Sequence, residues 1–369
     1  MDELEDFVAC GEKFTRFRDH RSMPLTGGFG RMKFDQVEKL AEKKCIRLVY
    51  TVFSLEFHLS MYLVYKILFI FKKMFYLDQE LKSKVDTRGD EDNYIMKVRT
   101  EMEKLMNRRM NRWKSVDYDR LASLTYLLGS VAAYDYACLL KVFKEIRQRN
   151  PEFLPRTMLD FGSGVGTVTW AVKEVLGKSI YETINVEPSR DMNDLHRMIL
   201  STTFDPLSST LPSGFHFRLQ LPRDEKTKYD LVVSAFTFLE FRNHKERLNN
   251  LHTLWERVEP GGFLVLTEVG STSGFFVLAE ARNYLMELFN DPNPELSGYI
   301  YAPCPHEYLC PRVNEGRKPC LFDVRYKNFP FKWAPGAMNE NIYESKFTYL
   351  IARKGMYTYL VLYIVFSKT

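Results

Sequence analysis

The feature that most constrains the fold of this chain is a glycine-rich loop at residues 160–166, which reads Asp-Phe-Gly-Ser-Gly-Val-Gly. A short apolar strand is expected just before the loop, at about residues 158–160, and a helix just after it, at about residues 168–176. Glycine lets the backbone turn sharply and approach a ligand that side chains would otherwise block. The sequence therefore predicts a nucleotide-binding loop between a strand and a helix.

Two further features narrow the kind of nucleotide site. A second strand, at about residues 183–187, ends at Glu187, roughly twenty residues past the loop, where an acid suits the hydroxyls of a ribose. A tight Pro-Gly-Gly turn at residues 259–262 leads into another strand at about residues 263–268. Dehydrogenase loops usually read G-x-G-x-x-G, whereas this loop reads G-x-G-x-G after a leading Asp.

This combination resembles the class I S-adenosylmethionine methyltransferases. The resemblance implies an α/β fold of the class I methyltransferase-like Rossmann type, and the sequence adds an N-terminal helical region and a cysteine-bearing C-terminal extension to it. A Rossmann domain that has lost its ligand is the alternative. If the ligand is retained, the resemblance implies that S-adenosylmethionine is held by Asp160, Gly162, Ser163, Gly164, Gly166 and Glu187.

Apolar runs and turn residues predict the order of elements. Strands are expected at about 158–160, 183–187, 215–221, 229–235 and 263–268, alternating with helices, which indicates an open and mostly parallel sheet. Two helices at about 94–115 and 121–149 precede them, and alternating segments at 323–331 and 346–353 are expected to pair as the last strands. This gives five segments: an N-terminal region with an atypical apolar insert (1–93), a helical lead-in (94–150), the Rossmann domain (151–290), a cysteine cluster with the final strands (291–355) and an atypical apolar tail (356–369).

The sequence leaves catalysis open. The segment after the fourth strand reads Ser-Ala-Phe-Thr-Phe-Leu-Glu at residues 234–240, without the Asn/Asp-Pro-Pro-aromatic turn of amino methylases. No cysteine nucleophile lies between Cys138 and Cys304. Glu240 is a candidate general base, or a structural acid at the start of a helix. No catalytic residue is assigned.

Three cysteines crowd into a proline-rich segment: Cys304, Cys310 and Cys320. Soft sulfur ligands at such turns favour zinc or an iron–sulfur cluster. Three thiols are one short of the usual four ligands, and His306 is a candidate for the fourth. The alternative is three ordinary cysteines in a loop.

Taken together, several segments are similar to the mitochondrial small-ribosomal-subunit assembly family of methyltransferase-like proteins, over about residues 90–355. The segment Ala-Pro-Cys-Pro-His-Glu at residues 302–307 is the most specific, and the other matching segments are residues 159–170, 186–189, 229–236, 264–270 and 346–352. The resemblance implies an assembly factor of the mitochondrial matrix that supports mitochondrial translation by binding the small subunit, its ribosomal RNA and ribosomal proteins. An active ribosomal RNA methyltransferase is the alternative.

The same resemblance implies a four-iron four-sulfur cluster, with Cys304, Cys310 and Cys320 on three of the family's four ligand positions. The fourth position lies beyond the last strand in the family, where residues up to Thr369 hold no cysteine. Zinc is the alternative metal. Residues 46–76 and 356–369 have no counterpart, and we hypothesise that they are intervening sequence carried into a gene model.

The charge and hydropathy of the chain indicate whether it can contact RNA or insert into a membrane. The net charge of +5 permits contact with RNA, and the basic residues of the expected helix at 94–115 form either a solvated surface or a phosphate-contacting face. The apolar stretch 48–71 carries Glu56, His58 and Lys66 near its middle. Each charged residue at mid-bilayer costs about 2.5–3.5 kcal/mol on insertion scales, so stable membrane insertion is not expected. The acidic N-terminus is unlike a mitochondrial presequence.

Overall fold

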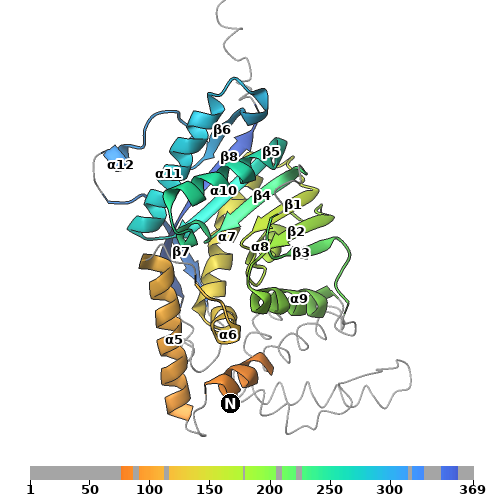
Figure 1. The fold of residues 1–369 in the computed structure, drawn as a ribbon, viewed down its shortest axis with the longest axis vertical. Helices are drawn as coiled ribbons and strands as arrows, with labels where there is room; N and C mark the ends of the chain where they lie inside the picture. Colours follow the sequence, from red (N-terminus) through yellow and green to blue (C-terminus); the bar gives the residue numbers. More distant parts are fainter. Residues whose placement is uncertain are drawn as a thin grey trace, which may run out of the picture. The chain divides into compact units, whose positions relative to one another are not determined.

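A computed structural model of the chain describes residues 76–85, 91–111, 116–177, 179–204, 210–221, 227–314, 318–327 and 342–355 (Figure 1). These residues belong to the second of the two compact units into which the chain divides, Lys72–Thr369. The apolar stretch 48–71 and the tail 356–369 lie outside the described residues. The expectations about them stay predictions.

The core of the described part is an eight-stranded sheet in the order β3-β2-β1-β4-β5-β8-β6, with β7 pairing with β8. β1 through β5 run parallel, and β8 runs antiparallel to its neighbours β5, β6 and β7. This topology confirms the class I methyltransferase-like Rossmann fold. The strands are β1 (Thr157–Phe161), β2 (Glu182–Val186), β3 (Phe215–Arg218), β4 (Tyr229–Ala235), β5 (Val258–Val269), β6 (Gly298–Ala302), β7 (Phe322–Tyr326) and β8 (Tyr343–Lys354).

Helices cover both faces of the sheet, with α10 and α11 in front of β5 and β8 and α7 behind them in Figure 1. Beyond a short helix at residues 76–84, the helices are α5 (Glu91–Asn111), α6 (Arg120–Leu128), α7 (Ser130–Arg149), α8 (Thr167–Val175), α9 (Arg190–Phe204), α10 (His244–Glu256), α11 (Thr272–Phe289) and α12 (Pro311–Asn314), with 3₁₀ turns η2 (Phe238–Glu240) and η3 (Pro294–Leu296). None of the described helices alone is long and apolar enough to cross a membrane, although α6 and α7, bent by 57°, pass that test as a pair by length and composition.

Apolar patterning explains where the core lies. The β4 residues Leu231, Val232 and Val233 are fully buried, as expected of a central parallel strand covered on both faces. The sequence of the helix expected at 94–115 also carries an apolar stripe, Val98, Met102, Leu105, Met110 and Trp113. In α5 the first three of these residues are buried, and Val98 and Leu105 join a second cluster with α6 and the start of α9. The side chains of the other two lie outside the described residues.

Three details differ from the sequence prediction. The single helix expected at 121–149 is wrong, because Gly129 is extended (φ −79°, ψ −171°) and separates α6 from α7. The tight turn expected at residues 259–262 is instead an irregularity inside β5, where the pairing with β4 shifts register. β6 was not predicted, while the expected pairing of the last two alternating segments is confirmed by Asp323 opposite Lys346 in β7 and β8.

Candidate functional site

The glycine loop lies between β1 and α8, at the carboxyl ends of the parallel strands. β1 has β2 on one side and β4 on the other, so the strand order reverses at this point of the sheet. Ligands of open α/β sheets bind in the crevice outside the strand ends at such a reversal. The topology therefore places the predicted loop where a nucleotide would bind.

The loop folds back over the end of β2. The amides of Gly162 and Ser163 donate to the Val186 carbonyl at 2.8 and 3.1 Å. Gly164 (φ 50°) and Gly166 (φ 88°) adopt left-handed conformations that favour glycine. A Cβ at Gly166 would overlap the His196 ring, whereas one at Gly164 would meet nothing within 4 Å. Gly166 is therefore needed for packing, and Gly164 borders open space.

Glu187 follows β2 and holds the loop. Its carboxylate accepts the Gly164 amide at 3.0 Å and the Ser189 amide at 2.8 Å, and the residue is 8% exposed. Burial raises the pKa of Glu187, and the two amide hydrogen bonds oppose that rise. Because an ionised carboxylate offers about four acceptor positions, Glu187 can still receive the hydroxyls of a ribose.

Two buried ionisable side chains, Asp160 and His196, lie beneath the glycine loop. Asp160 is fully buried, and neither of its carboxylate oxygens has a hydrogen-bond partner among the described residues. Burial, and then the charge of Glu187, raise the pKa of Asp160 well above its usual value. Burial and the neighbouring Arg197 lower the pKa of His196 to about 3, so its ring is neutral. The paired acids Asp160 and Glu187 make this end of the sheet electronegative when they ionise.

A cleft of about 700 Å³ opens above the loop, within the range of small-molecule sites. Of the predicted site residues, Gly162, Gly164 and Glu187 line it. Asp160, Ser163 and Gly166 do not, and Asp160 and Ser163 are almost fully buried. Other residues lining the cleft come from the segment before α6, the start of α9 and the end of β4, among them Val116, Asp117, Tyr118, Ser189, Met192, Phe236, Thr237 and Glu240.

Most of the other lining residues were not predicted from the sequence, and Phe236 and Tyr118 show why. Phe236 has a positive φ of 58°, which is strained for an aromatic residue; its amide donates to the Thr267 carbonyl at 2.8 Å. No pattern in the sequence indicates that conformation. Tyr118 reaches the cleft from 44 residues before Gly162, and only the fold brings them together.

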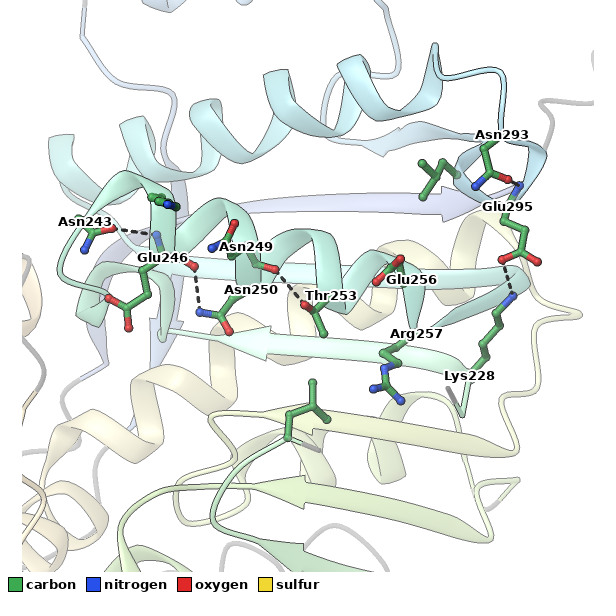
Figure 2. Close-up of a pocket in the computed structure, with 13 residues that line it drawn as sticks. Lys228, Asn243, Glu246, Asn249, Asn250, Thr253, Glu256, Arg257, Asn293 and Glu295 are labelled. Carbon is green, nitrogen blue, oxygen red and sulfur yellow. Dashed lines mark hydrogen bonds and ion pairs between the residues drawn. The ribbon is translucent and has the colours of Figure 1, made fainter. Parts of the chain in front are cut away.

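A larger cavity of about 990 Å³ runs along α10, away from the glycine loop (Figure 2). Its polar side chains are largely engaged with their own elements. Asn243 accepts the Glu246 amide at 2.9 Å, and the Asn250 side chain donates to the Glu246 carbonyl at 2.9 Å. None of the predicted site residues lines this cavity, so the smaller cleft is the candidate site.

The three predicted cysteine ligands are half-buried, free thiols in the loops between β6 and β7. Burial first, and then the charges of Cys304 and Cys310, raise the pKa of the Cys320 thiol, so the three lie within electrostatic range of one another. They do not form a closed ligand set: within the described ranges, no group of three or more His, Cys, Asp or Glu could hold a metal ion.

Arg282 of α11 anchors this cysteine segment. The side chain is 6% exposed and donates to the Tyr308 carbonyl at 3.1 Å and to the carbonyl of His306. The ring Nδ1 of His306, the candidate fourth ligand, lies 3.3 Å from the same guanidinium. Cys304 and Cys310 interact electrostatically with Arg282, which places a cation beside two of the thiols.

The strand order, the glycine loop and the cleft at the strand reversal define a class I methyltransferase-like Rossmann protein. Residues 120–366 also match the family model described as mitochondrial small ribosomal subunit Rsm22. That match covers more than half of the 369 residues, so the chain belongs to the Rsm22 family.

Relatives agree with this assignment. The human ribosome assembly protein METTL17, mitochondrial, is 35% identical over 247 residues, which are 66% of this chain and 51% of that protein. The ribosome assembly protein RSM22, mitochondrial, of Saccharomyces cerevisiae is 21% identical over 50% of this chain and 40% of its own length. The chain thus spans about half or less of these relatives. Among solved structures, the magnesium protoporphyrin IX methyltransferase of Synechocystis aligns at 13% identity and a TM-score of 0.38, covering 68% of this chain and 92% of that one.

Proposed function

We propose that this protein is an assembly factor of the small subunit of the mitochondrial ribosome, located in the matrix, where it binds the subunit's ribosomal RNA and ribosomal proteins and supports mitochondrial translation. Membership of the Rsm22 family over residues 120–366 carries this proposal, because that match includes both the Rossmann domain and the cysteine segment. The relatives named above are described as mitochondrial ribosome assembly proteins, which supports the same role for this chain.

We propose further that the cleft binds S-adenosylmethionine, which supplies an activated methyl group when bound. Glu187 would accept the ribose hydroxyls, and Gly164 leaves room for the ligand because a side chain there would point into open space. Asp160 is buried behind the loop, and its raised pKa keeps its carboxyl protonated in the unliganded protein. The carboxylate of Glu187 favours a cationic ligand when it is ionised, and S-adenosylmethionine carries sulfonium and ammonium groups.

An active ribosomal RNA methyltransferase is the second candidate, and the state of Glu240 bears on it. Both carboxylate oxygens of this candidate base already accept hydrogen bonds, from Tyr118 and from the Val116 amide. Glu240 is therefore engaged with residues 116–118 in the unliganded protein, which supports ligand binding without methyl transfer as the first candidate.

Incubation of the full-length protein with radiolabelled S-adenosylmethionine and immature small mitochondrial subunits separates the two candidates. We expect bound cofactor and no methyl incorporation into RNA above that of a heat-inactivated sample. Incorporation that disappears in a Glu240→Gln variant would instead support the enzyme.

We also propose that Cys304, Cys310 and Cys320 supply three ligands of a four-iron four-sulfur cluster, with zinc as the alternative metal. Two observations support this: the three free thiols are half-buried in one proline-rich segment, and Arg282 holds that segment through the carbonyls of His306 and Tyr308. In the described residues the three thiols do not converge on one metal position, so the cluster would require them to move closer together and to gain a fourth ligand.

Anaerobic purification of the full-length protein tests the cluster. We expect a brown protein that contains iron and sulfide, and Cys304→Ser, Cys310→Ser or Cys320→Ser should bleach it. Cys138→Ala is the matched control, because Cys138 is a buried free cysteine of α7 outside this segment. A colourless protein with stoichiometric zinc, or with no metal, contradicts the iron–sulfur proposal.

A further inference from the structure

A short segment before α6, residues 116–118, is tied to both walls of the candidate cleft; we call it the strap. All of its residues line the cleft, and Val116 is 8% exposed. On the β2 side, the Ser189 hydroxyl donates to the Tyr118 carbonyl at 2.7 Å. On the β4 side, the strap is held by Glu240. The strap is therefore hydrogen-bonded to residues that follow β2 and β4, and it lines the same cleft as Gly162, Gly164 and Glu187.

Glu240 engages the strap with both carboxylate oxygens. Oε1 accepts the Tyr118 hydroxyl at 2.9 Å, and Oε2 accepts the Val116 amide at 3.3 Å. These hydrogen bonds are charge-assisted, which makes them stronger than bonds between neutral groups. The contacts span 122 and 124 residues of sequence, so they are formed by the tertiary fold and not by local structure.

The turn that carries Glu240 is itself fixed. The Leu239 amide donates to the buried Glu268 carboxylate at 3.2 Å, and the Glu240 amide donates to the Thr237 carbonyl at 3.0 Å. Hydrogen bonds from neighbouring backbone amides therefore hold the turn from which Glu240 reaches the strap.

The opposite anchor connects the strap to the proposed ribose site. Ser189 donates its hydroxyl to the Tyr118 carbonyl, and its backbone amide donates to the carboxylate of Glu187. The Ser189 hydroxyl also accepts the Met192 amide at 3.2 Å, at the start of α9. A ligand that orders Glu187 would therefore also order the residue that holds the strap.

We propose that Glu240 is a positioning residue that latches the strap across the cleft, so that S-adenosylmethionine is retained as a slowly exchanging ligand. The inference rests on the proposed S-adenosylmethionine site. In the latched state Glu240 serves the strap and not a methyl acceptor, which assigns the proposed base a retention role.

The test uses S-adenosylhomocysteine as the probe and Tyr118→Phe as the main variant of the full-length protein, because this change removes only one hydroxyl. We expect the probe to dissociate about tenfold faster from Tyr118→Phe, and from Glu240→Gln, than from the unchanged protein, the size expected for loss of a hydrogen bond to a charged group. Tyr181→Phe is the control, since Tyr181 is an exposed tyrosine that does not line the cleft. Equal dissociation rates in all four proteins overturn the latch.

Hydrogen exchange of the Val116 amide gives a second readout that needs no ligand. This amide donates to Glu240, so its exchange should accelerate about tenfold in Glu240→Gln and stay unchanged in Tyr181→Phe. No acceleration in the unliganded protein overturns the latch. If the unchanged protein fails to bind the probe while the acceleration is seen, the S-adenosylmethionine site fails and the Glu240 contact stands.

Discussion

Glu187→Gln is expected to weaken the binding of S-adenosylmethionine about 10- to 100-fold, the size of a lost hydrogen bond to a charged group. The carboxylate accepts the amides of Gly164 and Ser189 on its two oxygens. A glutamine keeps only one oxygen, so one of those amides would face an NH₂ group and the loop would lose its fixed position. The charge that favours a cationic ligand would be lost as well. Isothermal titration calorimetry measures the change.

Glu182→Gln is the matched control for that experiment. Glu182 begins the same strand, but its side chain is 40% exposed and does not line the cleft. Its replacement should leave the affinity within about twofold, because exposed charges contribute little. If both variants bind equally well, Glu187 does not hold the ligand.

Asp160→Asn is expected to stabilise the unliganded protein at neutral pH, because the folded protein must keep the Asp160 carboxyl protonated while the unfolded chain ionises it, at about 1.4 kcal/mol for each unit by which the pKa is raised. The carboxyl is fully buried with both oxygens unpartnered, and its pKa is raised well above the usual value. An asparagine carries no charge and fills nearly the same volume. Urea denaturation of the two proteins measures the difference in the free energy of unfolding.

The sign of the pH dependence follows from the raised pKa. Above the unfolded value of about 3.9, the unfolded chain releases the Asp160 proton while the folded protein retains it, so the unchanged protein loses stability as pH rises. Asparagine does not titrate, so it adds no such pH dependence to the free energy of unfolding. The stability gap should therefore be smallest at low pH, widen as the pH rises above about 4, and become constant once the pH exceeds the raised pKa of the folded protein. A gap that does not change with pH, or a less stable variant at every pH, contradicts this account of Asp160.

The fold was predictable where one short pattern determines one element. The loop glycines and the apolar run of β4 have few structural alternatives, and the β4 bounds agree with the prediction. The break at Gly129 was missed because a single glycine is also tolerated inside a helix. β6 was missed because Gly298–Ala302 is too short to be distinguished from a loop without its partner β8.

The candidate site was predictable only in its local part. Gly162, Gly164 and Glu187 come from one strand–loop–helix–strand unit and line the cleft together. The strap and Phe236 depend on contacts between distant segments and on a strained backbone, for which the sequence holds no periodic signal. The cysteines were recognised by their crowding into one proline-rich segment, but closeness in sequence does not determine whether the thiols converge on one metal.

The proposed role in assembly of the small mitochondrial subunit is tested most directly by sucrose-gradient sedimentation of mitochondrial extracts. The extracts come from cells that lack their own Rsm22-family member and express the epitope-tagged full-length protein. We expect the protein to co-sediment with immature small ribosomal subunits and its loss to deplete mature small subunits. We also expect expression of the Glu240→Gln variant to restore the mature small subunits without methyl transfer. A protein that stays at the top of the gradient while small subunits mature normally would contradict the account.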